Sequence, residues 1–184
     1  MNSPANFCKR ACNAYVIPCS LYQEQVMFFE VNKPGLEQGK QCEEVLRSLP
    51  EWFGIESALL TYAAEINFLP TYTAVASGRT IGFVTVRQHF SESAEIRIMG
   101  VVPEFQYRGV GRALLETVET DLSRRGVKFL QVKTLSPSRP DAAYRKTRRF
   151  YLSAGFSPLE EMPELWGAEN PCLILVKKLE ENCG

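Results

Sequence analysis

The chain has 184 residues, a length typical of one domain. Apolar residues make up 45% of it, enough for a packed core, and Lys+Arg and Asp+Glu both number 21. A net charge of zero provides no global basic field that would draw the chain to nucleic acid or to a membrane surface. No apolar run approaches the roughly 18 residues of a membrane span. The composition therefore predicts a globular protein with neither nucleic acid nor membrane as partner, and the cytoplasm is the expected location.

The N-terminal segment differs from the rest of the chain. Residues 1–22 have weak periodicity and contain three of the six cysteines, which are Cys8, Cys12, Cys19, Cys42, Cys172 and Cys183. No pair has the Cys-x-x-Cys spacing of a zinc site, so no metal is expected. A chain with this apolar content does not need disulfides. The pattern predicts an N-terminal arm over 1–22 and a single domain over 23–184.

Apolar periodicity and helix-breaking residues predict the elements in chain order. Pro50 and Pro70 end two helices, and Gly126 and Gly155 end two more. The predicted elements are a strand at 26–31, helices at 42–49 and 55–68, a hairpin of strands at 72–76 and 81–88, a strand at 94–102, a helix at 109–125, a strand at 129–132, a helix at 141–154 and a strand at 172–176. This order predicts an α/β sandwich with a mixed sheet.

The most informative local feature is the connection between the strand that ends at Pro103 and the helix that begins at Gly109. The first N–H groups of a helix have no internal partner, and the helix dipole adds positive potential there. Gly109 and Gly111 let the backbone approach an anion closely. The segment therefore predicts a pyrophosphate cradle, with Arg108 and Arg112 adding positive charge.

Three other interpretations of this segment compete with the pyrophosphate cradle. A surface turn before a glycine-started helix would account for Gly-x-Gly alone. The Gly-x-Gly-x-x-Gly pattern of a dinucleotide site is not satisfied, because Leu114 occupies the third position. A P-loop is excluded, because no Gly-Lys-Ser/Thr follows.

Two segments resemble one protein family. The run Gln106-Tyr107-Arg108-Gly109-Val110-Gly111 resembles the Gln/Arg-x-x-Gly-x-Gly/Ala signature of the GNAT superfamily of acyl-CoA-dependent N-acyltransferases. Downstream, Arg149-Phe150-Tyr151-Leu152-Ser153-Ala154-Gly155-Phe156 is similar to the family's Phe-Tyr-x-x-x-Gly-Phe segment. The two matches cover roughly residues 81–156, in the family's order. The resemblance implies a mixed, mostly antiparallel central sheet that is flanked by helices and splayed at the acetyl-CoA site.

The resemblance also implies how acetyl-CoA binds, as co-substrate and without a metal. The loop would hold the coenzyme A pyrophosphate, and the end of the preceding strand would pair with the pantetheine arm. The residues implied in coenzyme binding are Met99, Gly100, Val101, Gln106, Tyr107, Arg108, Gly109, Val110, Gly111 and Arg112. One position departs from the family pattern, because many members carry Asn seven residues before the motif tyrosine, where this chain has Tyr144.

The resemblance implies that Tyr151 is the acid that protonates the leaving thiolate, against the alternative of a core aromatic beside Phe150. Glu95 is the candidate base, because Ala-Glu-Ile at this distance from the loop resembles the histone-acetylating branch of the family. Alternation along the strand predicts that Glu95 and Arg97 share one face with Met99 and Val101. The alternative for Glu95 is an ion pair with Arg97 on a solvated face.

For the other candidate site residues, a surface or packing role is the alternative to a functional one. His89, the only histidine, is a residue type suited to proton transfer, but its place at a hairpin end favours the surface. Trp52, Phe53 and Trp166 are candidates for an acceptor pocket. Acidic residues that could attract an amine, or simply lie in solvent, are Asp141, Glu160, Glu161 and Glu164. The basic run 145–149 could reach a coenzyme phosphate or form a solvated helix face.

The sequence thus predicts acetyl transfer from acetyl-CoA to a primary amine of an unidentified acceptor. A small molecule, including an antibiotic or a polyamine, is the first expectation. A protein lysine or N-terminus is the second, because of Ala94-Glu95-Ile96. A non-catalytic acyl-CoA sensor is the third, although it would need neither Tyr151 nor Glu95. A homodimer is left open.

Overall fold

The computed structural model describes residues 28–180. In chain order the elements are β1 (Glu30–Val31), α1 (Gly39–Arg47), α2 (Pro50–Phe53), α3 (Glu56–Ile66), β2 (Thr71–Ala76), β3 (Arg79–Phe90), β4 (Ser93–Val101), a 3₁₀ helix (Pro103–Phe105), α4 (Val110–Arg124), β5 (Phe129–Leu135), α5 (Ala142–Ser153), β6 (Ser157–Met162) and β7 (Cys172–Lys178). The arm predicted over 1–22 and the first residues of the strand predicted at 26–31 lie outside the described residues, so the domain division stays a prediction.

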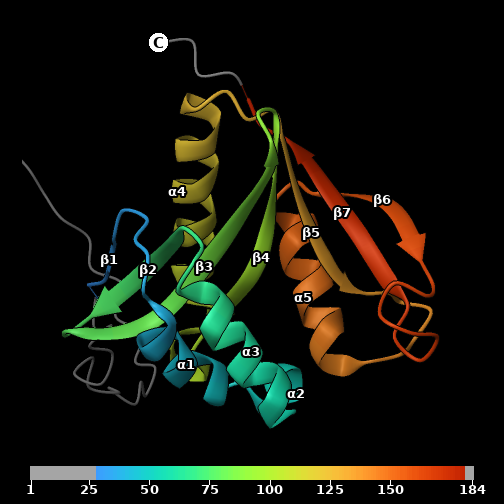
Figure 1. Cartoon of the computed structure of the whole chain (residues 1–184), viewed down its shortest axis with the longest axis horizontal. Helices are drawn as coiled ribbons and strands as arrows, with labels where there is room; N and C mark the ends of the chain where they lie inside the picture. The colour runs from blue at the N-terminus through green and yellow to red at the C-terminus, as the bar shows by residue number, and fades with distance from the viewer. Residues whose placement is uncertain (1–27, 181–184) are drawn as a thin grey trace, which may run out of the picture.

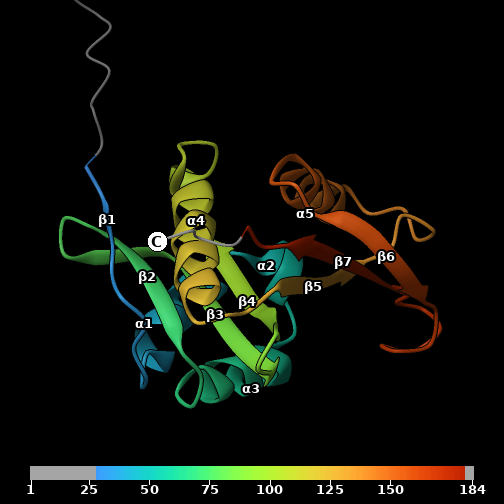
Figure 2. The same cartoon turned by 90° about the horizontal axis from the view of Figure 1, so that it is seen from above.

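One open sheet organises the described part of the chain. Its seven strands lie in the order β1-β2-β3-β4-β5-β7-β6, and only the β4–β5 pair is parallel. Helices α1 and α3 lie on one side of the sheet, and α4 and α5 lie on the other (Figures 1 and 2). The mixed, mostly antiparallel sheet flanked by helices that was predicted is therefore confirmed.

The core forms where α1 and α4 pack on the two faces of the central strands. Helix α4 buries the predicted stripe of Val110, Leu114, Val118 and Leu122, each at most 1% exposed. This spacing of three and four residues places the four side chains on one helix face, which packs against the sheet. The packed stripe anchors α4, and its N-terminus is thereby held at a constant place beside the end of β4.

The two central parallel strands separate partway along their length. Residues Ser93 to Ile96 of β4 pair with Phe129 to Val132 of β5, and no pairing continues beyond them. The strands then diverge toward α2 and α5 (Figure 1). Backbone groups that face the gap have no ladder partner across it, so they remain available to another molecule. The splay expected from the family resemblance is present.

A β-bulge changes which side chains of β4 share a face. Thr85 of β3 pairs with Ile98, whereas the next residue, Val86, pairs with Ile96, so Arg97 is an extra residue in β4. Neighbouring residues of β3 face opposite sides of the sheet, and paired residues face the same side. Ile96 and Ile98 therefore face opposite sides, and the simple alternation assumed from the sequence fails here.

The bulge separates Glu95 from Met99. Glu95 pairs with Arg87, and the side chains of both Arg87 and Arg97 contact Glu65 of α3, which places these three β-strand residues on the α3 side. Met99 lies on the opposite side, next to the start of α4. Glu95 and Arg97 share one side of the sheet as predicted, but the prediction that Met99 shares it is wrong, because an inserted residue reverses a period of two.

Besides the single-turn 3₁₀ helix at Pro103–Phe105, two elements, α2 and β6, were not predicted. Pro50 ends one helix but also starts the short helix α2, where a missing N–H costs nothing at the first helical position. Strand β6 is exposed along nearly its whole length, so it lacks the apolar alternation that identifies a half-buried strand. Of these two, α2 matters for the site, because it carries Trp52 and Phe53 to the gap between β4 and β5.

Candidate active site

A cavity of about 360 Å³ opens where β4 and β5 separate. Its walls come from the end of β4, the loop that leads into α4, and helices α2 and α5. The residues that line it are Leu49, Trp52, Phe53, Met99, Gly100, Val101, Gln106, Tyr107, Gly109, Gly111, Arg112, Lys146, Thr147, Phe150 and Tyr151. Eight of the ten residues implied in coenzyme binding are among them, so one concave site brings together segments from both motifs.

The N-terminus of α4 forms one end of this cavity. Gly109 caps the helix with φ +85°, a left-handed conformation that L side chains rarely adopt, and no atom lies within 4 Å of where its Cβ would be. No side chain caps the first turn of α4, so its N–H groups remain directed at the cavity end. Both the helix dipole and these N–H groups favour an anion there.

Two of the residues implied in coenzyme binding, Gln106 and Arg112, form hydrogen bonds within the protein. The Gln106 amide donates to the Val101 carbonyl at 3.0 Å, which braces the loop against the end of β4. The Arg112 guanidinium donates to the Ser153 carbonyl at 3.0 Å and thereby ties α4 to α5. Two of the residues implied in coenzyme binding, Arg108 and Val110, do not line the cavity. Arg108 is exposed, whereas the Val110 side chain is buried in the core. Val110 can therefore act only through its backbone.

Gly111 provides a direct test of this cavity. A Cβ at this position would lie 3.3 Å from a ring atom of Phe150 and 3.4 Å from the Met99 methyl, both in the cavity wall. We expect Gly111→Val to weaken acetyl-CoA binding more than about tenfold, since its methyl groups must displace the wall or enter the cavity. Gly111→Ala should cause a smaller loss. Calorimetry would measure both affinities, and unchanged binding by a folded Gly111→Val protein would place the coenzyme elsewhere.

Tyr151 lies at the inner end of the cavity. It is 4% exposed, and its hydroxyl donates to the Met99 sulfur at 3.5 Å, a weak acceptor. Burial raises the pKa of the Tyr151 phenol, so this group remains protonated at neutral pH. Its ring also packs against Phe150 and Phe156. Tyr151 thus packs as a core aromatic and also lines the cavity, so its packing does not exclude the predicted role as acid.

Glu95 has partners that the sequence did not indicate. Its side chain is 4% exposed, and Oε2 lies 2.7 Å from His89 Nε2 and 3.0 Å from Lys133 Nζ. Burial alone would raise the pKa of Glu95, but the hydrogen bonds and charges of Lys133 and His89 outweigh it and hold the pKa below the usual range. Glu95 is therefore an ionised, buried carboxylate at neutral pH.

The predicted alternative for Glu95 is wrong. No ion pair joins Glu95 to Arg97, which instead pairs with Glu65 at 2.8 Å, and the Glu95 side chain is not on a solvated face. His89 does reach the surface, with 31% of its side chain exposed, but it also contacts Glu95. The contact between His89 and Glu95 could have been predicted from the short β3–β4 turn, since a tight hairpin brings the residues on either side of it together.

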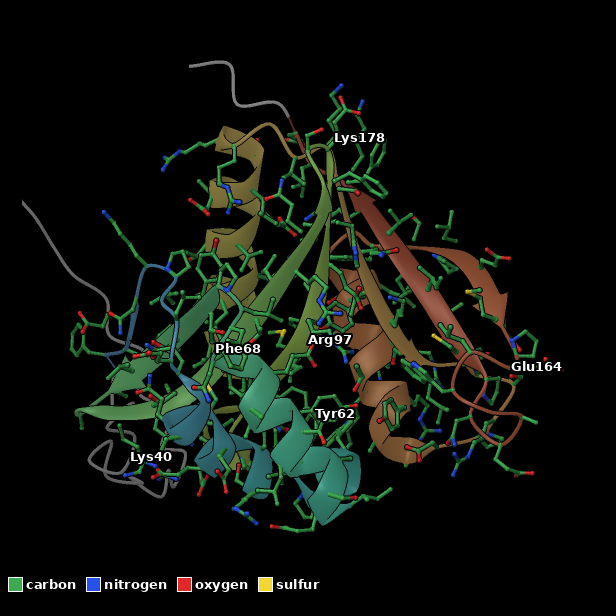
Figure 3. The ribbon with its side chains drawn as sticks, in the orientation of Figure 1. Lys40, Tyr62, Phe68, Arg97, Glu164 and Lys178 are labelled. Carbon is green, nitrogen blue, oxygen red and sulfur yellow. The ribbon has the colours of Figure 1, made fainter. Side chains whose placement is uncertain are left out.

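A second, smaller cavity of about 120 Å³ lies on the Glu95 side of the gap. It shares Trp52, Phe53, Met99, Thr147 and Tyr151 with the first, so the two cavities meet at the inner end of the cleft. Its other lining residues are Tyr62, Glu95, Ile96, Arg97, Ile98, Val132, Lys133, Thr134, Tyr144 and Trp166. Figure 3 shows Tyr62 and Arg97 projecting into the space between α3, β4 and α5.

The aromatic candidates for an acceptor pocket all lie in this second cavity. Trp52 is held there by a hydrogen bond from its indole N–H to the Thr147 hydroxyl at 3.0 Å, which links α2 to α5 across the gap. Tyr144 also lines this cavity, and burial raises its pKa. The residue that departs from the family's asparagine therefore faces the second cavity, and it does not line the first.

The acidic candidates outside β4 do not line either cavity. Asp141 caps α5 by accepting from the Tyr144 N–H, and Glu161 binds the hydroxyls of two nearby serines. Glu164 lies at the far edge of the molecule, away from Arg97 and Tyr62 (Figure 3). From the basic run, Lys146 lines the first cavity.

Within residues 28–180, no helix is long and apolar enough to cross a membrane, and no cluster of His, Cys, Asp or Glu side chains could hold a metal ion.

The fold and the cleft define a class: an α/β protein with a sheet splayed over a helix N-terminus that suits a phosphate group. Comparison with known proteins gives the family. The model of the GNAT acetyltransferase domain matches residues 58–158, and the chain therefore belongs to the GNAT family.

One curated relative and two solved structures illustrate the similarity. An uncharacterised N-acetyltransferase of Chlorobaculum tepidum is 37% identical over 65 residues, a match that spans 35% of this chain and 42% of that protein. A GNAT-family acetyltransferase structure from Desulfovibrio desulfuricans superposes with a TM-score of 0.73 at 20% identity, covering 83% of this chain and 100% of that one. An aminoglycoside 6'-N-acetyltransferase with coenzyme A superposes with a TM-score of 0.63 at 17% identity, covering 84% and 99%.

Proposed function

We propose that the chain transfers an acetyl group from acetyl-CoA to a primary amine. The observation that carries this proposal is the continuity of the cleft. An uncapped helix N-terminus that suits an anion lies at one end, a protonated tyrosine lies at the middle, and an ionised carboxylate lies on the other side. Two reactants that enter from opposite sides would meet at Tyr151 and Met99, where the cavities join. Holding both reactants in one cleft supplies up to roughly 7–11 kcal/mol of the barrier.

The coenzyme would bind in the larger cavity. The first turn of α4 would take the pyrophosphate through backbone N–H groups, with Arg112 and Lys146 adding positive charge at the rim. The unpaired edge of β4 from Met99 to Val101 would hydrogen-bond the pantetheine amides. The similar aminoglycoside 6'-N-acetyltransferase structure contains coenzyme A, which supports coenzyme A as the kind of ligand that this chain binds.

The reaction needs proton transfers at the amine and at the sulfur besides the acyl transfer. A carboxylate base takes one proton from the ammonium, and the neutral nitrogen then forms a bond to the thioester carbon. As the C–S bond breaks, an acid donates a proton to the departing thiolate, and the nitrogen releases a second proton, which restores the acid. The proton on the carboxylate then passes to solvent, so each turnover releases one amide, one free thiol and one proton. Glu95 fits the base because it is ionised and lines the smaller cavity, and Tyr151 fits the acid because it remains protonated.

The acceptor is proposed to be a small molecule, because the smaller cavity holds only about 120 Å³ and six of its fifteen lining residues are aromatic. A protein lysine or N-terminus is the second candidate, since Ala94-Glu95-Ile96 resembles the histone-acetylating branch. A non-catalytic sensor would bind acetyl-CoA without turnover. Free-thiol release measured over a panel of small amines and peptides, with acetyl-CoA affinity measured in parallel, separates these. Tight binding with no thiol release above background for any amine or peptide would contradict the enzyme.

A further inference from the structure

We propose that the Thr134 hydroxyl binds the acceptor, and that the acceptor is a primary amine on an aromatic or apolar body. We further infer that this acceptor carries one uncharged hydrogen-bonding group and no second positive charge. This inference rests on the proposed function and names the substrate class of the smaller cavity. Three observations carry it: the aromatic walls, the balance of charge and an orphaned hydroxyl.

Aromatic side chains form much of the wall of the smaller cavity. They come from α2, α3, α5 and the turn between β6 and β7, and they are Trp52, Phe53, Tyr62, Tyr144, Tyr151 and Trp166. The Phe53 and Tyr62 rings pack edge to face at 5.8 Å, and Trp52 is fixed by its bond to Thr147. Fixed rings offer flat faces to an aromatic or apolar group and can also attract a single ammonium.

The charges around the smaller cavity do not suit a polycation. Among the described residues that line it, Glu95 is the one carboxylate, whereas Arg97 and Lys133 are both positive. Glu95 already pairs with Lys133 at 3.0 Å, and Arg97 pairs with Glu65. One ammonium can approach Glu95, but no further carboxylate in this lining would compensate a second. A polyamine or an aminoglycoside is therefore a poor fit.

Thr134 supplies the third observation. It is 2% exposed, and its Oγ1 is the one buried side-chain oxygen or nitrogen without a hydrogen-bond partner among residues 28–180. It lines the smaller cavity on β5, just beyond the last residue that pairs with β4. An unbonded buried hydroxyl lowers stability, so a valine of the same shape would serve a purely structural position better. Almost none of the oxygen surface is accessible, so the side chain must rotate about its Cα–Cβ bond to offer this unused hydroxyl to the acceptor.

The variant Thr134→Val tests the hydroxyl directly, and Thr85→Val is its matched control. Both threonines are buried in the sheet, but the Thr85 hydroxyl is bonded to that of Thr71 at 3.0 Å. We expect Thr134→Val to melt at or above the wild-type temperature, and Thr85→Val to melt lower by roughly 2–4 °C. The two readouts are melting temperature and the steady-state constants for the acceptor. A lower melting temperature for Thr134→Val would overturn the inference, because the hydroxyl would then have a structural role.

An acceptor panel tests the substrate class. We expect phenethylamine, tyramine and phenylalanine amide to have kcat/KM values at least tenfold above that of spermidine. Tyramine or phenylalanine amide should exceed phenethylamine at least fivefold, and Thr134→Val should abolish that advantage while acetyl-CoA affinity stays unchanged. Thr85→Val should retain it.

Each contrary result has its own meaning. If spermidine, kanamycin or a peptide is the better acceptor, or if the fivefold advantage is missing or survives in Thr134→Val, this inference is wrong and acetyl transfer stands. If no amine or peptide in the panel raises thiol release above background, the proposed function fails and the inference fails with it.

Discussion

Replacement of Tyr151 by phenylalanine is expected to lower turnover by roughly 10²–10⁴, the usual contribution of a positioned acid. The substitution keeps the ring that packs between Phe150 and Phe156 and removes only the hydroxyl. Because burial raises the pKa of Tyr151, its proton remains bound at neutral pH and is available to the leaving thiolate. Acetyl-CoA affinity should change little, so steady-state kinetics and calorimetry together separate chemistry from binding.

Tyr72→Phe is the matched control for this variant. Tyr72 is also buried, and its hydroxyl donates to Asp121 at 2.6 Å, but it does not line either cavity. Tyr72→Phe should lose about 1 kcal/mol of stability and keep wild-type turnover. Near-normal turnover in Tyr151→Phe would leave Tyr151 with its packing role alone.

Glu95→Gln is expected to lower turnover at pH 7 by roughly 10²–10⁴ and to recover part of that loss at high pH. Glutamine keeps the shape of the side chain but cannot accept a proton, and at high pH the free amine arrives already neutral. Since Lys133 and His89 hold the pKa of Glu95 below the usual carboxyl range, Glu95 is ionised throughout the neutral range. A rise in wild-type activity between pH 6 and 9 would therefore not report Glu95, and the acceptor's own titration would contribute to it.

The informative quantity is the ratio of Glu95→Gln to wild-type turnover across pH on one acceptor. Glu65→Gln is the control, because it also neutralises a carboxylate that pairs with a cation, Arg97, but it does not line either cavity. A loss in Glu95→Gln that stays constant with pH, or that Glu65→Gln reproduces, would move the base to another group. His89 would then be the next candidate, since it contacts the same carboxylate.

The sequence by itself determined the glycine-containing loop at the start of α4 and the general fold. Gly109 and Gly111 lie at the start of a strongly amphipathic helix, and both the left-handed cap and the free N–H groups follow from a few consecutive residues. Tyr151 was also found from a local motif. These features could be predicted because helix starts, caps and periodicity depend on neighbours in the chain.

Only the tertiary structure decided the smaller-cavity side of the cleft. One extra residue at Arg97 reversed the alternation of β4 and turned Glu95 to the α3 side, away from Met99. The partners of Glu95 come from β3 and β5, and the Trp52–Thr147 bond joins helices 95 residues apart. No local pattern specifies a bulge position or such pairings, because they depend on strand register and on packing between distant segments. The lack of a hydrogen-bond partner for the Thr134 hydroxyl likewise follows only from the positions of all its neighbours in the folded chain.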